Sequence, residues 1–205
     1  MIELNNEISV DVLARAKKIK CVIFDVDGVM TDGGLGIGDD GQEYKNFHSL
    51  DGLGMKLLKK TGVEMAIITG RTSNVVKKRA ETTGIAHFYQ GVEDKLEAFN
   101  DLLQKMRLQA DEVAFMGDDV VDAPAMLRCG LALTVPSAHR LLKPHAHYMT
   151  IAPAGRGAVR EVCELIMQAQ GTLEAQMAPY FKWVAQMAQF LNESCKWRSF
   201  LSNKI

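Results

Sequence analysis

Short apolar runs recur along the chain, and each one ends at polar or glycine residues. The first is CVIF at residues 21–24, and similar runs lie at 65–69, 113–116 and 131–135. Runs of four or five residues that are apolar at nearly every position are typical of strands buried on both faces of a parallel sheet. The pattern therefore predicts four strands of such a sheet.

Segments with helical start and stop signals lie between these runs. They cover residues 51–60, 73–83, 95–106 and 122–128. Glycine follows three of them, and glycine commonly ends a helix because it accepts the left-handed backbone conformation. Strands that alternate with helices predict an α/β domain with a Rossmann-like parallel sheet and helices on both faces.

Two segments depart from this alternation. Residues 33–47 hold an Asp40-Gly41 turn between short extended stretches, which predicts a β-hairpin that projects from the sheet. Residues 157–201 are amphipathic and predict helix with a break near Pro179, packed on its own domain or on a partner subunit. We therefore expect one domain over residues 1–171 and a C-terminal helical extension over residues 172–205.

Composition narrows the class of protein. A chain of 205 residues, 47% of them hydrophobic, is long enough for one well-buried core. The net charge of -1 leaves no broad basic surface for nucleic acid or for anionic lipid. The four cysteines are far apart and form no CxxC pair, and no apolar run reaches the length of a membrane span. We expect reduced thiols, a cytoplasmic protein, and neither a nucleic-acid nor a membrane partner.

A first acidic cluster follows the first predicted strand. Asp25 and Asp27 stand two residues apart and would face the same way if the strand geometry continued. Two neighbouring carboxylates repel each other, so they require a shared proton or a cation. A loop of solvated aspartates is the alternative, but it would not need the buried strand in front of it.

Three further polar clusters also follow predicted strands. They are Thr69-Gly70-Arg71, Lys95 after GVED, and the stretch GDDVVD with Asp118, Asp119 and Asp122. Taken singly, Thr69 suits a helix cap and Lys95 a solvated first turn. Ligands bind beyond the carboxyl ends of the strands in parallel sheets, however, and capping explains only one of the three later aspartates.

Together the clusters contain the parts of a phosphoryl-transfer site. Mg²⁺ prefers oxygen ligands, for which Asp25 and Asp118 are suitable. The Lys95 ammonium and the Thr69 hydroxyl can neutralise and hold the phosphoryl oxygens. A carboxylate nucleophile would divide the hydrolysis into two easier steps, and Asp27 can move the protons.

The order DxDG, Thr, Lys, GDDxxD resembles that of the haloacid dehalogenase-like phosphatases. The resemblance implies that Asp25 is the nucleophile, and that Asp27 is the acid and base whose backbone carbonyl also meets the metal. It further implies phosphate contacts from Thr69 and Lys95, a metal ligand in Asp118, and orienting or capping roles for Asp119 and Asp122. No gap between the motifs can hold a cap domain, so we expect a capless haloacid dehalogenase fold with the projecting hairpin.

More narrowly, residues 20–171 resemble the 3-deoxy-D-manno-octulosonate 8-phosphate (KDO 8-phosphate) phosphatases. The matching stretches are FDVDGVMTDG, FHSLDGLG, AIITGR, YQGVEDK, GDDVVDAPAM and GRGAVREVCELI. The resemblance implies a homotetramer with active sites shared between subunits, which acts on a small phosphorylated sugar acid in lipopolysaccharide precursor synthesis. The implied substrate contacts are Asp27, His48, Ser49, Leu50, Asp51, Gly52, Lys56, Gly70, Arg71, Arg79, Lys95 and Arg156.

Two positions depart from that family's pattern. His48-Ser49-Leu50 replaces a stretch that usually contains Asn and Arg, and Lys56 stands in place of an Arg. Lysine cannot grip a carboxylate with two parallel hydrogen bonds as arginine does. The missing cap further suggests that residues 155–160, with Arg156 and Arg160, close the site of a neighbouring subunit.

Other functions stay open at this point. A phosphatase for another sugar acid, such as an N-acylneuraminate 9-phosphate, would have the same fold. A receiver domain also combines paired acids with Thr and Lys, but it carries its phosphoacceptor on a later strand than the paired acids. An inactive scaffold is disfavoured because every catalytic position is filled.

Overall fold

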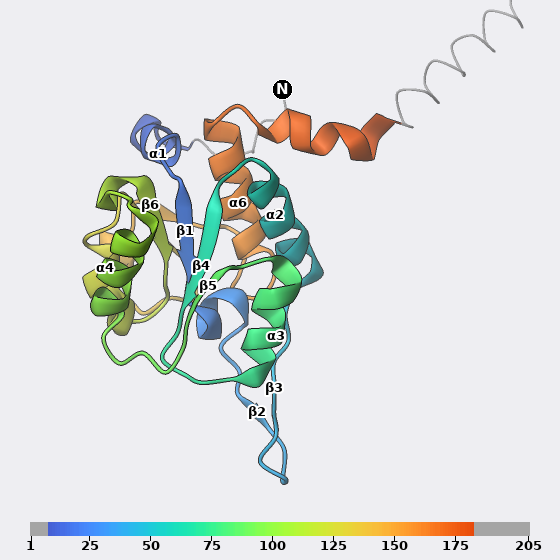
Figure 1. Cartoon of the computed structure of the whole chain (residues 1–205), viewed down its shortest axis with the longest axis vertical. Coiled ribbons are helices and arrows are strands. Elements are labelled where there is room, and N and C mark those ends of the chain that lie inside the picture. Colours follow the sequence, from blue (N-terminus) through green and yellow to red (C-terminus); the bar gives the residue numbers. More distant parts are fainter. Residues whose placement is uncertain (1–7, 183–205) are drawn as a thin grey trace, which may run out of the picture.

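The structure is a computed structural model that describes residues 8–182. Its centre is a six-stranded parallel sheet with the strand order β5-β4-β1-β6-β7-β8 (Figure 1). The strands are β1 (Cys21–Phe24), β4 (Glu64–Ile68), β5 (His87–Tyr89), β6 (Val113–Met116), β7 (Leu131–Thr134) and β8 (Tyr148–Met149).

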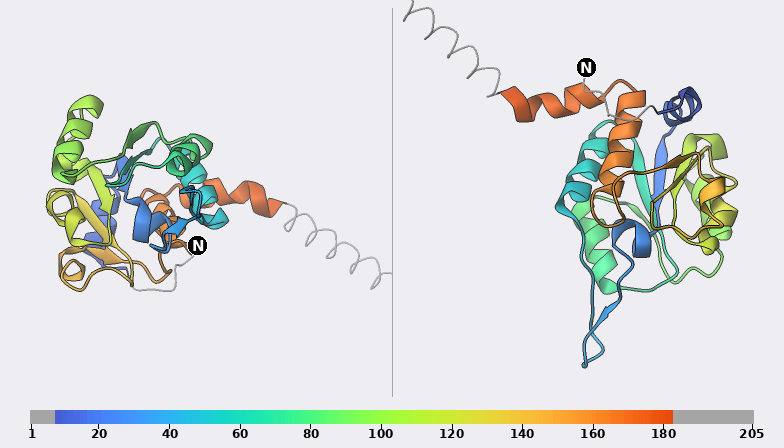
Figure 2. Two further views of the ribbon diagram at one scale, coloured as in Figure 1. Left: turned by 90° about the horizontal axis from the view of Figure 1, so that it is seen from below. Right: turned by 180° about the vertical axis from the view of Figure 1, so that it is seen from behind.

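Helices cover both faces of this sheet, as the alternating pattern predicts. The helices are α1 (Val10–Ala16), α2 (Ser49–Lys60), α3 (Asn74–Thr83), α4 (Lys95–Met106), α5 (Ala123–Met126) and α6 (Ala158–Ala169). One hydrophobic core joins α1, α2, α3 and α6 to the sheet, and a second joins α4 and α5 to its other face. Figure 2 shows the two layers from below and from behind.

Strand β1 illustrates why the apolar runs take this place. Its side chains alternate between the two cores, with Val22 and Phe24 in one and Cys21 and Ile23 in the other. All four are fully buried, so a polar residue at any of them would lose its hydration without a partner. The pairing of Phe24 with Ile67 on one side and Met116 on the other brings the carboxyl ends of three strands to one level.

The strand predictions are confirmed to within one residue, whereas two helices differ. Helix α2 begins at Ser49, two residues before the predicted start, and α5 covers only Ala123–Met126 of the predicted 122–128. A 3-10 helix, Val120–Asp122, precedes α5. Helix α1 and strand β8 carry no clear sequence signal, because each is short.

The predicted hairpin is also present. Strands β2 (Gly36–Ile37) and β3 (Glu43–Tyr44) pair antiparallel, and the hairpin projects from the domain (Figure 1). Gly41 has a φ of +75°, which favours glycine at this turn. Ile37 and Tyr44 expose 60% and 63% of their surface, so the hairpin carries an apolar surface without a partner in the described chain.

The C-terminal prediction needs one correction. The helical segment at residues 173–182 continues through Pro179, so the break near that residue is wrong for the described chain. The interruption instead follows α6 at Gly171, whose φ is +69°. Leu173 and Met177 are buried against the core, and the remaining predicted helix, up to residue 201, lies outside the described residues.

Three of the four cysteines, Cys21, Cys129 and Cys163, are buried free thiols. Burial raises the pKa of Cys21 to about 12, which suits an unreactive thiol. The fourth, Cys195, lies outside the described residues. Within residues 8–182, no helix combines the length and the apolar character that a membrane crossing requires.

Candidate active site

The polar clusters meet at the carboxyl edge of the sheet. Asp25 follows β1, Thr69 follows β4, and Asp118 stands two residues after β6. Lys95 is the first residue of α4, whose N-cap Asp94 accepts hydrogen bonds from two backbone N–H groups. Asp25, Thr69 and Lys95 are all at least 94% buried. The sequence motifs therefore form one site because neighbouring parallel strands end together.

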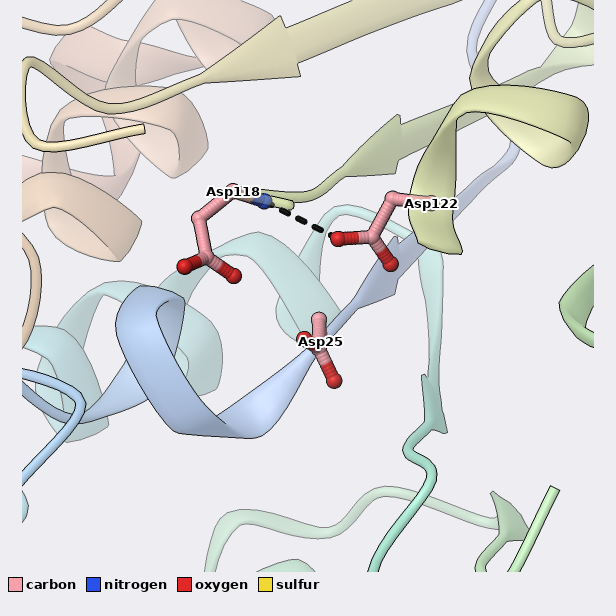
Figure 3. Close-up of side chains that lie close together, drawn as sticks. All are labelled: Asp25, Asp118 and Asp122. Carbon is pink, nitrogen blue, oxygen red and sulfur yellow. Dashed lines mark hydrogen bonds between the residues drawn. The ribbon is translucent and has the colours of Figure 1, made fainter. Parts of the chain in front are cut away.

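Three carboxylates form the centre of this site. Asp25, Asp118 and Asp122 each offer one oxygen, and these oxygens lie within 4.8 Å of one another (Figure 3). The expected pairing of the Asp25 and Asp27 side chains is wrong. Asp25 is still extended, but the stretch that follows, Val26–Met30, is a kinked helical turn in which Asp27 and Gly28 have non-helical backbone angles, and the Asp27 carboxylate contacts Lys45.

Asp122 orients the groups around it in the cluster. It is fully buried, and its carboxylate accepts hydrogen bonds from the backbone N–H groups of Asp118 (3.0 Å) and Asp119 (3.1 Å). The same carboxylate lies 2.6 Å from the Lys95 ammonium. Asp119 is exposed and caps the short 3-10 helix through a hydrogen bond from Val120. Asp122 thus holds the turn that presents Asp118.

Burial and like charges shift the acidic groups. Burial, with the Asp122 charge in addition, raises the pKa of Asp25 to about 6, although Lys95 at 3.0 Å opposes the shift. Burial and the charges of Asp25 and Asp122 raise the pKa of Asp118 to about 7. For Lys95, burial alone would lower the pKa, but the two carboxylates beside it raise the pKa overall.

The arrangement fits a divalent cation. One oxygen of Asp118 is buried and has no hydrogen-bond partner, which is costly unless a cation or water meets it. Three carboxylates share one ammonium, so the described cluster has more negative than positive charge. Carboxylate oxygens are the ligands that Mg²⁺ prefers.

Gly28 places the loop of residues 25–32, which contains the predicted nucleophile and is called the catalytic loop, against the cluster. Its φ is +89°, and a Cβ atom built there would lie 2.0 Å from an oxygen of Asp118. Any larger residue would therefore displace the Asp118 carboxylate. The glycine of the DxDG motif thus has a steric reason as well as a conformational one.

The Asp27 side chain belongs to a second charged group. Its carboxylate lies 2.5 Å from the Lys45 ammonium and 3.8 Å from the Arg71 guanidinium. Glu43 approaches the same two cations at 3.0 Å and 3.3 Å, and the Lys45 side chain is fully buried. Sequence reasoning missed Lys45 and Glu43, because charged residues in a hairpin are usually solvated.

The predicted substrate contacts lie at the start of α2 and around it. Leu50, Lys56, Gly70, Arg71 and Arg156 are exposed, as is Ser49, the first residue of the helix. Gly52 is buried beside Arg79, whose guanidinium donates to the His48 carbonyl (3.0 Å) and lies 5.2 Å from the Phe47 ring centre. Arg79 is therefore partly buried, and its guanidinium is held by residues just before α2.

Two predicted residues have other partners. Asp51 is 2% exposed and accepts hydrogen bonds from the backbone of α6. Arg160 donates to Glu164 at 2.5 Å and contacts the Met177 sulfur. Its guanidinium is thus engaged within the C-terminal helices.

The raised pKa values predict how the stability of the metal-free protein depends on pH. Both aspartates would have a pKa of 3.8 when unfolded, against about 6 for Asp25 and about 7 for Asp118 when folded. The folded state holds these protons more tightly, so the two aspartates contribute stability that is fully present below about pH 4 and is lost as pH rises through 6 to 7. We expect this contribution, on the order of a few kcal/mol, to disappear when Mg²⁺ is bound.

Denaturant unfolding at pH 5 and pH 7.5, with chelator and with Mg²⁺, measures this pH dependence of stability. The metal-free wild type should lose more stability between pH 5 and pH 7.5 than metal-free Asp118→Asn. An equal loss of stability in the two proteins would contradict the prediction.

The comparisons with known proteins agree with this geometry. The haloacid dehalogenase-like hydrolase family matches residues 42–130. The KDO 8-phosphate phosphatase KdsC of Escherichia coli K12 is 47% identical over 167 residues, which cover 82% of this chain and 89% of the relative.

Two solved structures are similar over most of their length. One is the KDO 8-phosphate phosphatase of Yersinia pestis, with 48% identity, a TM-score of 0.80, and coverage of 80% of this chain and 89% of that chain. The other is the enzyme of Moraxella catarrhalis in complex with magnesium, phosphate and KDO. It has 40% identity, a TM-score of 0.82, and coverage of 83% and 98%.

The fold and the aspartate cluster therefore define a haloacid dehalogenase-like hydrolase. The sequence identity of 47% to the Escherichia coli phosphatase, over 82% of this chain, narrows this class further. The chain belongs to the KDO 8-phosphate phosphatase family.

Proposed function

We propose that the protein is a magnesium-dependent phosphatase that hydrolyses KDO 8-phosphate to KDO and inorganic phosphate in the cytoplasm. The observation that carries the proposal is the cluster of Asp25, Asp118 and Asp122 with Lys95 at the carboxyl edge of the sheet. This cluster occurs in a chain that is 47% identical over 167 residues to a phosphatase of that name.

In the first half of the reaction, a carboxylate oxygen of Asp25 attacks phosphorus. The bond between phosphorus and the sugar oxygen breaks, and its electron pair stays on that oxygen. The Asp27 carboxylic acid gives its proton to the departing alkoxide, so the sugar acid leaves as a neutral alcohol. Lys95 and Thr69 hold the phosphoryl oxygens while negative charge shifts between them.

In the second half, water attacks the phosphorus of the aspartyl-phosphate. The Asp27 carboxylate takes a proton from this water, and the bond between phosphorus and Asp25 breaks. Phosphate leaves and both aspartates return to their starting forms. Mg²⁺, held by the carboxylates of Asp25 and Asp118 and by the Asp27 carbonyl, would neutralise the phosphoryl charge when bound.

Asp27 must turn between two positions in this scheme. In the structure its carboxylate lies 2.5 Å from the Lys45 ammonium and 3.8 Å from the Arg71 guanidinium. Arrival of the phosphoryl group would draw Arg71 toward a new anion. We also propose that substrate binds to Arg71 together with His48–Leu50, Gly52, Lys56, Gly70, Arg79 and Arg156.

We propose further that the enzyme is a homotetramer with active sites shared between subunits. The exposed apolar residues of the projecting hairpin support association of this surface. The capless site also needs a neighbouring surface to exclude water. Light scattering of the wild type and of a hairpin variant, Ile37→Asp with Tyr44→Asp, tests this: the variant should be smaller, and an active monomeric wild type would refute it.

A substrate panel tests the proposed reaction. Phosphate release is measured from KDO 8-phosphate, N-acylneuraminate 9-phosphate and neutral sugar phosphates, with Mg²⁺ and with chelator. We expect KDO 8-phosphate to have the highest kcat/KM and chelator to remove the activity. A preference for N-acylneuraminate 9-phosphate would change the substrate but keep the reaction, and Mg²⁺-independent hydrolysis would refute the mechanism.

A further inference from the structure

Asp51 links two segments that are more than a hundred residues apart. One carboxylate oxygen accepts the backbone N–H of Arg160 at 2.8 Å, and the other accepts the N–H of Gly157 at 3.4 Å. Gly157 is the N-cap of α6 and has no side chain to cap the helix. Asp51, in the first turn of α2, therefore supplies the capping carboxylate that α6 lacks.

The loop before α6 is held on two other sides. The Gly155 N–H donates to the Val29 carbonyl at 3.0 Å, and a Cβ atom at Gly155 would lie 2.6 Å from the Asp32 nitrogen. The segment is therefore in close contact with the end of the catalytic loop in its own chain. On the outer side, Glu161 accepts hydrogen bonds from the N–H groups of Ile151 and Ala152.

These contacts fix the backbone on both sides of Arg156. The Arg156 side chain is exposed, whereas Asp51 is 2% exposed, so a sugar acid can reach the arginine but not the aspartate. Burial raises the pKa of Asp51, and the two N–H groups that it accepts oppose that shift. The Asp51 carboxylate is thus occupied by the protein itself.

We infer that Asp51 is a positioning residue, which holds the loop of Arg156 beside the catalytic loop of the same chain. This inference rests on the proposed function, because Arg156 is there a contact for the anionic sugar acid. Asp51 contributes to substrate binding through the backbone of residues 155–157. It follows that the loss of Asp51 should weaken binding of a substrate large enough to reach Arg156.

The central test compares two substrates in Asp51→Ala. KM for KDO 8-phosphate should rise by about tenfold, which corresponds to about 1.4 kcal/mol of binding free energy. The kcat/KM for p-nitrophenyl phosphate should change by less than about twofold, because this small ester would not reach Arg156. Asp51→Asn should recover part of the binding, since its amide oxygen can accept one N–H. Ser9→Ala, which removes the cap of α1 far from the site, is the matched control and should leave both substrates unchanged.

A double variant tests whether Asp51 acts through Arg156. In an Arg156→Ala background, Asp51→Ala should add little to KM for KDO 8-phosphate, because the contact that it positions is already gone. Additive effects, equal losses on both substrates, or no effect of Arg156→Ala alone would each overturn the inference. The substrate panel uses only the wild type, so its result does not depend on these variants. It therefore tests the proposed function independently of the role of Asp51.

Hydrogen exchange gives a readout that does not depend on activity. The backbone amides of residues 155–160 should exchange faster in Asp51→Ala than in the wild type, while those of β1 and β6 keep their protection. If Asp51→Ala does not fold, Asp51→Asn serves for the same comparisons with smaller expected changes. Unchanged exchange at residues 155–160 would overturn the inference.

Discussion

Asp25→Asn is expected to reduce turnover of KDO 8-phosphate by about 10³-fold or more, because the amide is a poor nucleophile for phosphorus. Asp25 is buried at the end of β1, 3.0 Å from Lys95, and asparagine has nearly the same shape. The fold should therefore persist. The assay is phosphate release with a large excess of variant enzyme.

Stability separates this loss from unfolding. Asparagine removes a buried carboxylate whose raised pKa shows that its charge is unfavourable in the metal-free protein. The thermal midpoint of Asp25→Asn without Mg²⁺ at pH 7.5 should thus equal or exceed that of the wild type. Turnover above the level of contaminating phosphatase would rule out Asp25 as the nucleophile.

Asp118→Asn should have the second largest effect, and that effect should fall on the metal. One oxygen of Asp118 is buried without a hydrogen-bond partner, and the negative charge of Asp118 is repelled by the charges of Asp25 and Asp122. Removing the charge should lower Mg²⁺ affinity by at least about 10- to 100-fold. That is the loss typically seen when a residue that only hydrogen-bonds to a metal ligand is mutated. Magnesium titrations of activity measure the shift.

Asp119→Asn is the matched control for this variant. Asp119 is the next residue, but it is exposed and caps the 3-10 helix. Its Mg²⁺ titration should overlay that of the wild type. If the Asp118→Asn titration overlays it as well, Asp118 is not a metal ligand.

Much of the fold follows from local patterns in the sequence. The apolar runs that became β1 and β6 predict those strands with their observed bounds. Such runs are apolar at every position, as strands buried on both faces of a parallel sheet require. Parallel pairing then brings Asp25, Thr69 and Asp118 to one edge of the sheet. The parallel pairing of these strands is thus sufficient to bring the predicted motifs together.

The errors arise where the backbone departs from regular geometry. The pairing of Asp25 with Asp27 assumed that the strand continues, but Gly28 has a φ of +89° and the chain turns there. The partner of Asp27 is Lys45 in the hairpin, 18 residues away, and no local pattern joins them. Contacts of this kind depend on tertiary structure rather than on spacing.

The break near Pro179 failed for a different reason. Proline disfavours the interior of a helix, yet residues 173–182 stay helical through it. Gly171 ends α6 instead, because its positive φ allows the backbone of Thr172 to bond back to Met167 at 2.8 Å. Tertiary packing of Leu173 and Met177 against the core then holds the following helix.

The most direct test of the account is to find the phosphate on the protein during turnover. Enzyme mixed with KDO 8-phosphate and Mg²⁺ is quenched with acid within the first turnovers, and the phosphorylated peptide is located by mass spectrometry. The account predicts phosphate on Asp25, at an amount that falls to zero in Asp25→Asn and with chelator. Phosphate on another residue, or full turnover without any phosphorylated enzyme, would contradict it.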